Sequence, residues 1–210
     1  MLSYGFKVEI WGEYACFTRP ENSAERESYD VITPSAARGI LESVMWKPAI
    51  EYVIDKIAIC APIRFEKIRR NEIDFSEKTE ETEDLRTPIT TKTLRNVHYV
   101  ITAHFNMTEK ATAEDNESKY SEMIRRRLGK GQHYQAPYLG MREFPAKVRI
   151  LTESDPEPEA INESRALGRM LYDMEYIKKT DENGEETIKE RIPKYFMAQM
   201  KHGIIDLRNV

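Results

Sequence analysis

The sequence predicts an α+β protein built on a βαββαβ unit. A strand–helix–strand pattern occurs twice in succession, and a β-rich tail follows it. Apolar residues that alternate with polar ones indicate the strands, and apolar residues three and four positions apart indicate the helices. The chain has 210 residues, which is enough for one large domain or two small ones with a genuine core.

The first strand is predicted where Phe6, Val8 and Ile10 alternate with polar residues. Thr33 and Pro34 then have the residue types of a helix N-cap and a first helical residue. The predicted helix has an apolar face, and Pro48 is expected to end it. That face consists of Ala37, Ile40, Leu41, Val44 and Met45.

The second strand is predicted over Tyr52 to Phe65 and leads into a basic segment, Arg64–Asn71. The acidic stretch Glu72–Thr93 has little apolar periodicity, so we expect an exposed or mobile loop there. A third strand, a second helix and a short strand over Lys147–Leu151 follow. The third strand alternates cleanly at Val97, Tyr99, Ile101, Ala103 and Phe105, and the second helix has Tyr120, Met123, Ile124 and Leu128 on one side.

The tail begins with an acidic linker over Asp155 to Glu159. Two β-like stretches, Met170–Ile177 and Thr187–Ile192, flank Asn183-Gly184, which is a strong hairpin signal. Tyr195–Leu207 is interpreted as a strand or short helix with a turn at Gly203. We therefore predict a ferredoxin-like (RRM-like) βαββαβ domain over residues 1–145 and a small antiparallel β-rich domain over 146–210.

Composition excludes several classes of protein. No run approaches the roughly 20 apolar residues of a membrane helix, and no signal-peptide pattern occurs, so a cytoplasmic protein without a membrane partner is expected. Cys16 and Cys60 fit neither a disulfide framework nor a metal site, and we expect buried free thiols and no cofactor. The net charge of -4 hides basic clusters at residues 64–70 and 125–130, which leave room for a local anion-binding site.

The stretch Asn116–Ala146 is the most informative part of the sequence. A basic, partly apolar helix leads to a Gly-Lys-Gly turn and then to an aromatic loop that closes on Gly-Met-Arg-Glu-Phe-Pro-Ala. Cations on one element beside flat rings on the next suit a phosphate backbone with unstacked bases. The alternative is a solvated helix followed by an ordinary packed loop.

Five motifs in order resemble the subtype I-C CRISPR-associated endoribonuclease, a family of the repeat-associated superfamily. They are Gly12–Glu21, Ser28–Glu42, Trp46–Ile50, Ile68–Glu72 and Asn116–Ala146. The resemblance implies binding of the CRISPR repeat hairpin and metal-free cleavage of precursor CRISPR RNA at its 3′ base. It also implies that the protein stays on the 5′ handle of the guide (crRNA). There it would be a subunit of the type I-C interference complex (Cascade), against the backbone and large subunits.

Such cleavage uses the 2′-hydroxyl beside the scissile phosphate as nucleophile and leaves a 2′,3′-cyclic phosphate and a 5′-hydroxyl. The family usually has Tyr or His before its Trp-Lys-Pro motif and a Lys-His pair at the start of the second helix. This chain has Met45 at the first position and Lys119-Tyr120 at the second. Lys119 suits stabilisation of the phosphorane. Tyr120 either donates a proton, orients the hydroxyl or belongs to the core, and Met45 is expected to fill the apolar helix face.

The four histidines are the candidates to replace the missing one. His133 is preferred as a catalytic residue because it follows the helix that carries Lys119. His98 and His104 lie opposite the apolar set of the third strand and share a sheet face, and His202 is expected to be uninvolved. Trp46 is interpreted as a core anchor rather than a base-stacking residue. The predicted RNA-binding residues are Arg38, Arg69, Arg70, Arg126, Lys130, Tyr134, Tyr138 and Arg142.

Two hypotheses follow for the function. The first is an active processing nuclease with a rearranged catalytic set, and the second is a binding-only subunit that holds the 5′ handle. The departures at Met45 and Tyr120 favour the second, whereas the usual role of the family favours the first. We expect an active or weakly active nuclease. Arg142 is expected either to bridge a phosphate or to pair with Glu143.

Overall fold

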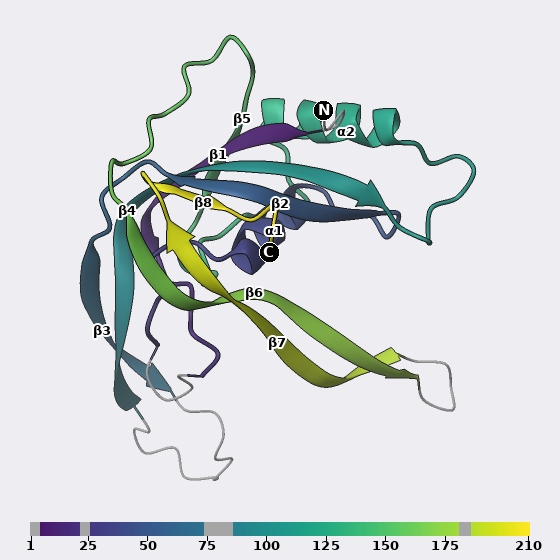
Figure 1. The fold of residues 1–210 in the computed structure, drawn as a ribbon. Helices are drawn as coiled ribbons and strands as arrows, with labels where there is room; N and C mark the ends of the chain where they lie inside the picture. Colours follow the sequence, from purple (N-terminus) through teal and green to yellow (C-terminus); the bar gives the residue numbers. More distant parts are fainter. Residues whose placement is uncertain (1–4, 22–25, 74–85, 181–185) are drawn as a thin grey trace.

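The part of the protein that the structure describes is an α+β fold of mostly antiparallel strands with two helices (Figure 1). We describe it from a computed structural model, which covers residues 5–21, 26–73, 86–180 and 186–210. The elements in chain order are β1 (Phe6–Ala15), α1 (Pro34–Val44), β2 (Ile50–Ile59), β3 (Phe65–Ile73), β4 (Arg86–Met107), α2 (Glu117–Gly129), β5 (Lys147–Leu151), β6 (Arg165–Thr180), β7 (Glu186–Met200) and β8 (Ile204–Asp206).

The main sheet has the strand order β5-β1-β4-β2-β8, and each neighbouring pair is antiparallel. β4 is the longest strand, with 22 residues. Its second half lies between β1 and β2, and its first half pairs with β3. Because paired residues of an antiparallel ladder share a face, the register places the apolar residues of the central strands together. Examples are the pairs of Ile10 with Tyr99 and of Ile57 with Ile101.

Both predicted helices are confirmed, together with the predicted Thr33-Pro34 start of the first. The Thr33 side chain accepts a hydrogen bond from the Ala36 amide (3.1 Å), and Pro34 opens α1. The Asn116 side chain accepts one from the Lys119 amide (2.8 Å) at the start of α2. These bonds satisfy amides that the helix itself leaves unpaired. The apolar faces of both helices belong to one core cluster with the alternating residues of β1, β2 and β4.

The C-terminal stretch contributes to both sheets. β6 and β7 form a separate two-stranded ribbon that extends away from the main sheet (Figure 1). β5 pairs with β1 and β8 pairs with β2, so both of these strands belong to the main sheet although they follow residue 145. The turn before β8 contains Gly203 at a φ of 72°. The predicted Asn183-Gly184 turn lies outside the described residues, and the two strands that flank it do pair as expected.

Two predicted boundaries are wrong. The stretch predicted as one strand from Tyr52 to Phe65 is interrupted, because β2 ends at Ile59 and β3 begins at Phe65. Residues 86–93, predicted as part of an acidic loop, form the start of β4 and pair with β3. The side chains of Thr91 and Thr93 are buried there, so the pairing partner and not the local composition fixes this segment. The rest of that predicted loop, residues 74–85, lies outside the described residues.

The prediction for Trp46 is also wrong, whereas that for Met45 is confirmed. Met45 is only 1% exposed and packs in the core, but Trp46 is 59% exposed. The helix ends at Val44 and Met45 is extended, with φ -152° and ψ 116°. Successive side chains of an extended chain point to opposite sides, so an inward Met45 directs Trp46 outward. No helix of the described residues is long and apolar enough to cross a membrane.

Candidate nucleic-acid interface

The first turn of α2 brings together Asp115, Lys119 and Tyr120. The Asp115 carboxylate accepts hydrogen bonds from the Thr112 amide (3.0 Å), the Thr112 hydroxyl (2.9 Å) and the Tyr120 hydroxyl (2.5 Å). The Lys119 ammonium lies 3.5 Å from Asp115 Oδ1 and donates to the Glu114 carbonyl (3.3 Å). Its side chain stays half-exposed. The half-exposed Lys119 ammonium therefore lies beside a carboxylate, Asp115, that already accepts three other hydrogen bonds.

The hydrogen bond to Asp115 determines the proton position on Tyr120. This bond, with help from burial, raises the pKa of Tyr120 to about 12, and the same bond is the main reason that the pKa of Asp115 lies well below its usual range. At neutral pH the phenol is therefore protonated and the carboxylate is charged. Tyr120 can donate a proton, but it cannot serve as a base at that pH.

The structure does not bring His133 to Lys119 and Tyr120. Lys119 lies in the first turn of α2, and His133 lies beyond the end of this 13-residue helix. At 1.5 Å per residue, the part of the helix from Lys119 to its last residue, Gly129, is about 15 Å long. His133 is exposed and lines a cavity with Trp11, Gln132 and Lys147. It is thus positioned among the loop residues and not among the residues of the first turn.

The other three histidines have partners elsewhere. His98 Nε2 lies 2.7 Å from Glu9, and His104 Nδ1 lies 2.9 Å from Asp55, and both carboxylates are buried. As predicted, these two histidines share the sheet face that points away from the helices, because they alternate with the core residues of β4. His202 Nδ1 lies 3.0 Å from the Asn162 side chain.

The loop over residues 130–146 is held in place by its backbone. The amides of Tyr134 and Gln135 donate to the Ser43 carbonyl at the end of α1 (2.8 and 3.0 Å). The Leu139 carbonyl accepts from the Cys16 amide (3.0 Å), and the Leu139 side chain is buried. The anchored loop leaves other side chains in solvent. Tyr134 is 76% and Tyr138 37% exposed, and Lys130 and Arg142 are exposed as well.

The predicted arginines divide into exposed and paired ones. Arg69 and Arg126 are exposed. Arg70 pairs with Glu143 and thereby joins β3 to the loop, so Glu143 pairs with Arg70 in place of its neighbour Arg142. The two arginines beside Arg126 are bound to backbone carbonyls: Arg125 donates to Gly5 (3.0 Å) and Arg127 to Val44 (2.9 Å). Of the three consecutive arginines, Arg127 is partly buried, whereas Arg125 and Arg126 are exposed.

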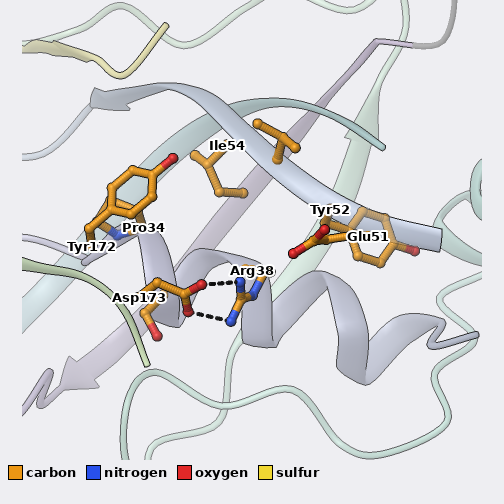
Figure 2. A pocket seen from close by; sticks show the side chains of 9 residues that line it. Pro34, Arg38, Glu51, Tyr52, Ile54, Tyr172 and Asp173 are labelled. Carbon is orange, nitrogen blue, oxygen red and sulfur yellow. Dashed lines mark hydrogen bonds and ion pairs between the residues drawn. The ribbon is translucent and has the colours of Figure 1, made fainter. Parts of the chain in front are cut away.

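Arg38 is partly buried between α1 and β6. Figure 2 shows its guanidinium facing the Asp173 carboxylate in a pocket lined by Glu51, Tyr52 and Tyr172. The contact is bidentate: Nη1 donates to Oδ2 (2.6 Å) and Nη2 to Oδ1. Arg38 Nε also lies 3.5 Å from Glu42. This geometry joins the β6–β7 ribbon to the first helix, and an RNA contact of Arg38 stays a prediction.

Replacing Arg38 by alanine is expected to lower the free energy of unfolding by about 1–3 kcal/mol, because it leaves the largely buried Asp173 carboxylate without its partner. If the ion pair with Asp173 is the main role of Arg38, RNA affinity should change little. Urea unfolding and RNA titration of the same variant separate these effects. Arg191→Ala, on the exposed surface of β7, is the matched control and should stay within about 0.5 kcal/mol of wild type. A loss of affinity without a loss of stability would instead place Arg38 on the RNA.

Asp115 and Trp11 are the residues that sequence reasoning missed. The Thr112-x-x-Asp115 spacing followed by Asn116 is a signal for a capped turn, and it could have identified Asp115 as a fixed acceptor. Trp11 had no such signal, since its partners come from β4 and β5. No cluster of three or more His, Cys, Asp or Glu side chains able to hold a metal occurs in the described part of the chain. Cys16 is a buried free thiol and Cys60 a partly buried one.

The fold is α+β, and the combination of exposed cations and rings on one anchored loop is typical of a nucleic-acid-binding protein. The chain matches the model of the family described as "CRISPR-associated protein (Cas_Cas5)", Cas_Cas5d, over residues 5–208. It belongs to this Cas5d family.

Two relatives carry the name CRISPR pre-crRNA endoribonuclease Cas5d. The protein of Mannheimia succiniciproducens is 46% identical over 221 residues, which cover 96% of this chain and 93% of that protein. The protein of Thermus thermophilus is 37% identical over 213 residues, which cover 96% and 90%. Two solved structures have a similar fold, each with a TM-score of 0.70, 20% identity and coverage of 97% of this chain and 91% of the other. One is titled as a CRISPR-associated protein and the other as a functionally uncharacterized protein from Streptococcus mutans.

Proposed function

We propose that this protein is a metal-independent endoribonuclease that binds the CRISPR repeat hairpin and cleaves precursor CRISPR RNA at the 3′ base of that hairpin. The observation that carries the proposal is the half-exposed Lys119 ammonium at the capped start of α2, in a chain that belongs to the Cas5d family. The names of its two relatives, at 46% and 37% identity over nearly the whole chain, support the same reaction.

The strand order supports a finer assignment of the fold. β5-β1-β4-β2, with α1 after β1 and α2 after β4, is the arrangement of a ferredoxin-like (RRM-like) βαββαβ unit. We assign the main sheet to that class. β5 belongs to this unit, so the proposed boundary at residue 145 moves to Leu151, and the β6–β7 ribbon with its flanking segments forms the C-terminal β-rich part.

In the proposed mechanism hydroxide removes the proton of the 2′-hydroxyl beside the scissile phosphate, O2′ attacks phosphorus, and the 5′-oxygen leaves. A 2′,3′-cyclic phosphate and a 5′-hydroxyl are the products. Lys119 stabilises the extra negative charge of the phosphorane. Tyr120, which holds its proton at neutral pH, donates it to the departing 5′-oxygen after its hydroxyl has left Asp115. The bond that forms is O2′–P, and the bond that breaks is P–O5′.

The remaining residues are proposed to hold the RNA. The exposed loop residues Lys130, His133, Tyr134, Tyr138 and Arg142 would contact phosphates and unstacked bases. Arg126 on α2 and Arg69 on β3 extend the cationic surface, and Arg70 supports it through Glu143. We place His133 in this binding set because about 15 Å of α2 lies between Lys119 and the end of the helix that precedes His133.

A second function is favoured by one specific observation. The Tyr120 hydroxyl is bonded to Asp115, and Met45 is buried, so neither residue supplies a base at pH 7. This geometry supports a handle-holding subunit with weak cleavage. Under both hypotheses, the processing nuclease and the handle-holding subunit, we propose that the protein stays on the 5′ handle. There it would contact the backbone and large subunits of the interference complex.

Incubation of end-labelled repeat RNA with the protein in EDTA tests the proposed function. One cut at the 3′ base of the hairpin, with a product that carries a cyclic phosphate, is the expected result. Tight binding without a cut would favour the handle-holding subunit. The absence of both binding and cleavage would contradict the proposal as a whole.

The cleavage rate is expected to rise with pH through the range from 6 to 9. Tyr120 has a pKa of about 12, so it stays protonated and competent as an acid throughout this range. Hydroxide must then remove the 2′-hydroxyl proton, and the rate should increase nearly tenfold per pH unit. Single-turnover rates at saturating protein measure the profile. A plateau that begins near pH 6.5, where an ordinary histidine titrates, would show that His133 or another histidine acts as the base.

A further inference from the structure

A row of three side chains crosses the sheet face that points away from the helices. Trp11 on β1 pairs in register with His98 on β4 and with Lys147 on β5. Residues that face each other in antiparallel strands point to the same side, so the indole lies between the imidazole and the ammonium chain. The indole and imidazole rings are 6.4 Å apart and nearly edge to face. The row presents one large flat ring with a cation beside it.

The row lines a cavity of about 620 Å³, which is within the range of about 300–1,000 Å³ typical of small-molecule sites. Ala61, Val97 and Pro145 give it apolar walls, and Glu13 and Asn96 add polar groups able to hydrogen-bond a base edge. Asn96 has a φ of 51°, in the left-handed region that asparagine adopts more readily than most residues other than glycine.

One of the two acidic residues that line this cavity, Glu9, is paired with basic side chains. Glu9 is buried and lies 2.7 Å from His98 Nε2. It also accepts a hydrogen bond from Arg149 Nε (2.9 Å). Burial acts to raise the pKa of Glu9, but the bonds from Arg149 and His98 outweigh it and hold this pKa below its usual value. The Glu9 charge is therefore matched by Arg149, and Lys147 and Glu13 are the exposed charged groups of the lining, of which Lys147 is the one able to meet an anion.

The cavity continues toward the proposed RNA-binding loop. A second cavity of about 370 Å³, lined by Gly131, Gln132 and His133, shares both Trp11 and Lys147 with the first. An RNA strand bound at His133 could therefore continue through the second cavity into the first and reach Trp11.

We propose that the cavity over Trp11 binds one unpaired nucleotide of the bound RNA, with its base stacked on the indole and its phosphate beside Lys147. This inference rests on the proposed RNA binding and adds a subsite on the opposite side of the sheet from the first turn of α2. A stacked base is sequence-tolerant because each base has a π-face, whereas Glu13 and Asn96 would select among bases.

Intrinsic fluorescence tests the subsite directly, because the chain has only two tryptophans. Trp46→Phe leaves Trp11 as the sole tryptophan. Fluorescein-labelled repeat RNA with a 2′-deoxy nucleotide at the cleavage site, which blocks the reaction, is titrated against this variant. Anisotropy reports binding, and an unlabelled copy of the RNA is used for tryptophan emission. The inference predicts saturable quenching of Trp11 with the same midpoint as the anisotropy. Binding without any change in Trp11 emission would overturn it and leave the proposed function intact, whereas no binding at all would overturn both.

Affinities of variants give the second readout. Trp11→Leu is expected to weaken RNA binding about 5- to 100-fold, and Trp11→Phe, which keeps a ring, should restore most of the affinity. Lys147→Ala removes one phosphate contact and should therefore lower the slope of log Kd against log salt concentration by about one. Tyr176→Leu, at a half-exposed ring on the β6–β7 ribbon, is the matched control. Equal affinities for Trp11→Leu and wild type would contradict the stacking role.

Discussion

Replacing Lys119 by alanine is expected to lower the single-turnover cleavage rate about 10²- to 10³-fold while RNA affinity changes less than about threefold. The ammonium is half-exposed beside Asp115 in the resting protein, and its charge acts most strongly when the phosphorane gains a further negative charge. Loss of one such donor costs this much in other enzymes that stabilise an oxyanion. Because a single exposed cation adds little to the binding of a polyanion, the defect should appear in the rate and not in Kd.

The control for this variant is Lys110→Ala. Lys110 is an exposed lysine in the turn that precedes α2, and its removal alters the same net charge. Its cleavage rate should match that of wild type. Rates from quenched-flow or manual quenching at saturating protein, and Kd from RNA anisotropy, give both quantities for each variant. Equal losses of rate in the two variants would show that Lys119 contributes only general positive charge and does not specifically stabilise the phosphorane.

Gly140→Ala is expected to lower the free energy of unfolding by about 3 kcal/mol or more. RNA binding should be lost under conditions in which this destabilised variant is largely unfolded. Gly140 has a φ of 83°, where a residue with a Cβ is strained. A Cβ there would lie 2.0 Å from the Cys16 carbonyl oxygen and 2.6 Å from its carbon, both of them backbone atoms that cannot move aside cheaply. The bond from the Cys16 amide to the Leu139 carbonyl would be lost with the displacement, and the loop that carries Tyr134 and Tyr138 would detach.

Gly39→Ala is the matched control for this prediction. Gly39 lies inside α1, and a Cβ at that position meets no atom within 4 Å. The same substitution should therefore stabilise the helix by about 0.5–1 kcal/mol. Urea unfolding of both variants measures the difference. If Gly140→Ala were as stable as wild type, the loop would not be held against Cys16 as described.

The parts of the fold that local sequence determines were predicted well. Thr33 was predicted as an N-cap because its side chain can satisfy a nearby amide, and such a bond requires no distant partner. Asn116 caps the second helix in the same way, although it was not predicted to do so. Residues 86–93 could not be predicted as strand, since they are ordered by β3 and their own composition is polar. The separation of β2 from β3 depends on the same long-range pairing.

The candidate site shows a similar division. Lys119 and Tyr120 were identified from a motif, but the bond that fixes the proton on Tyr120 depends on how the preceding turn folds. Arg38 and Asp173 are 135 positions apart, so a sequence cannot reveal that this arginine has an internal partner. Likewise, His133 follows α2 closely in sequence, yet the length of the helix places it far from Lys119.

The central claim is that the RNA supplies its own nucleophile and that Lys119 stabilises the resulting phosphorane. The most direct test replaces the single 2′-hydroxyl beside the scissile phosphate by hydrogen and measures cleavage and binding of this RNA in EDTA. We predict unchanged affinity and no cut at that phosphate, whereas the all-ribose RNA is cleaved once at the same position. Cleavage of the 2′-deoxy RNA at the usual site would contradict the claim, because the attacking group would then be water or a side chain.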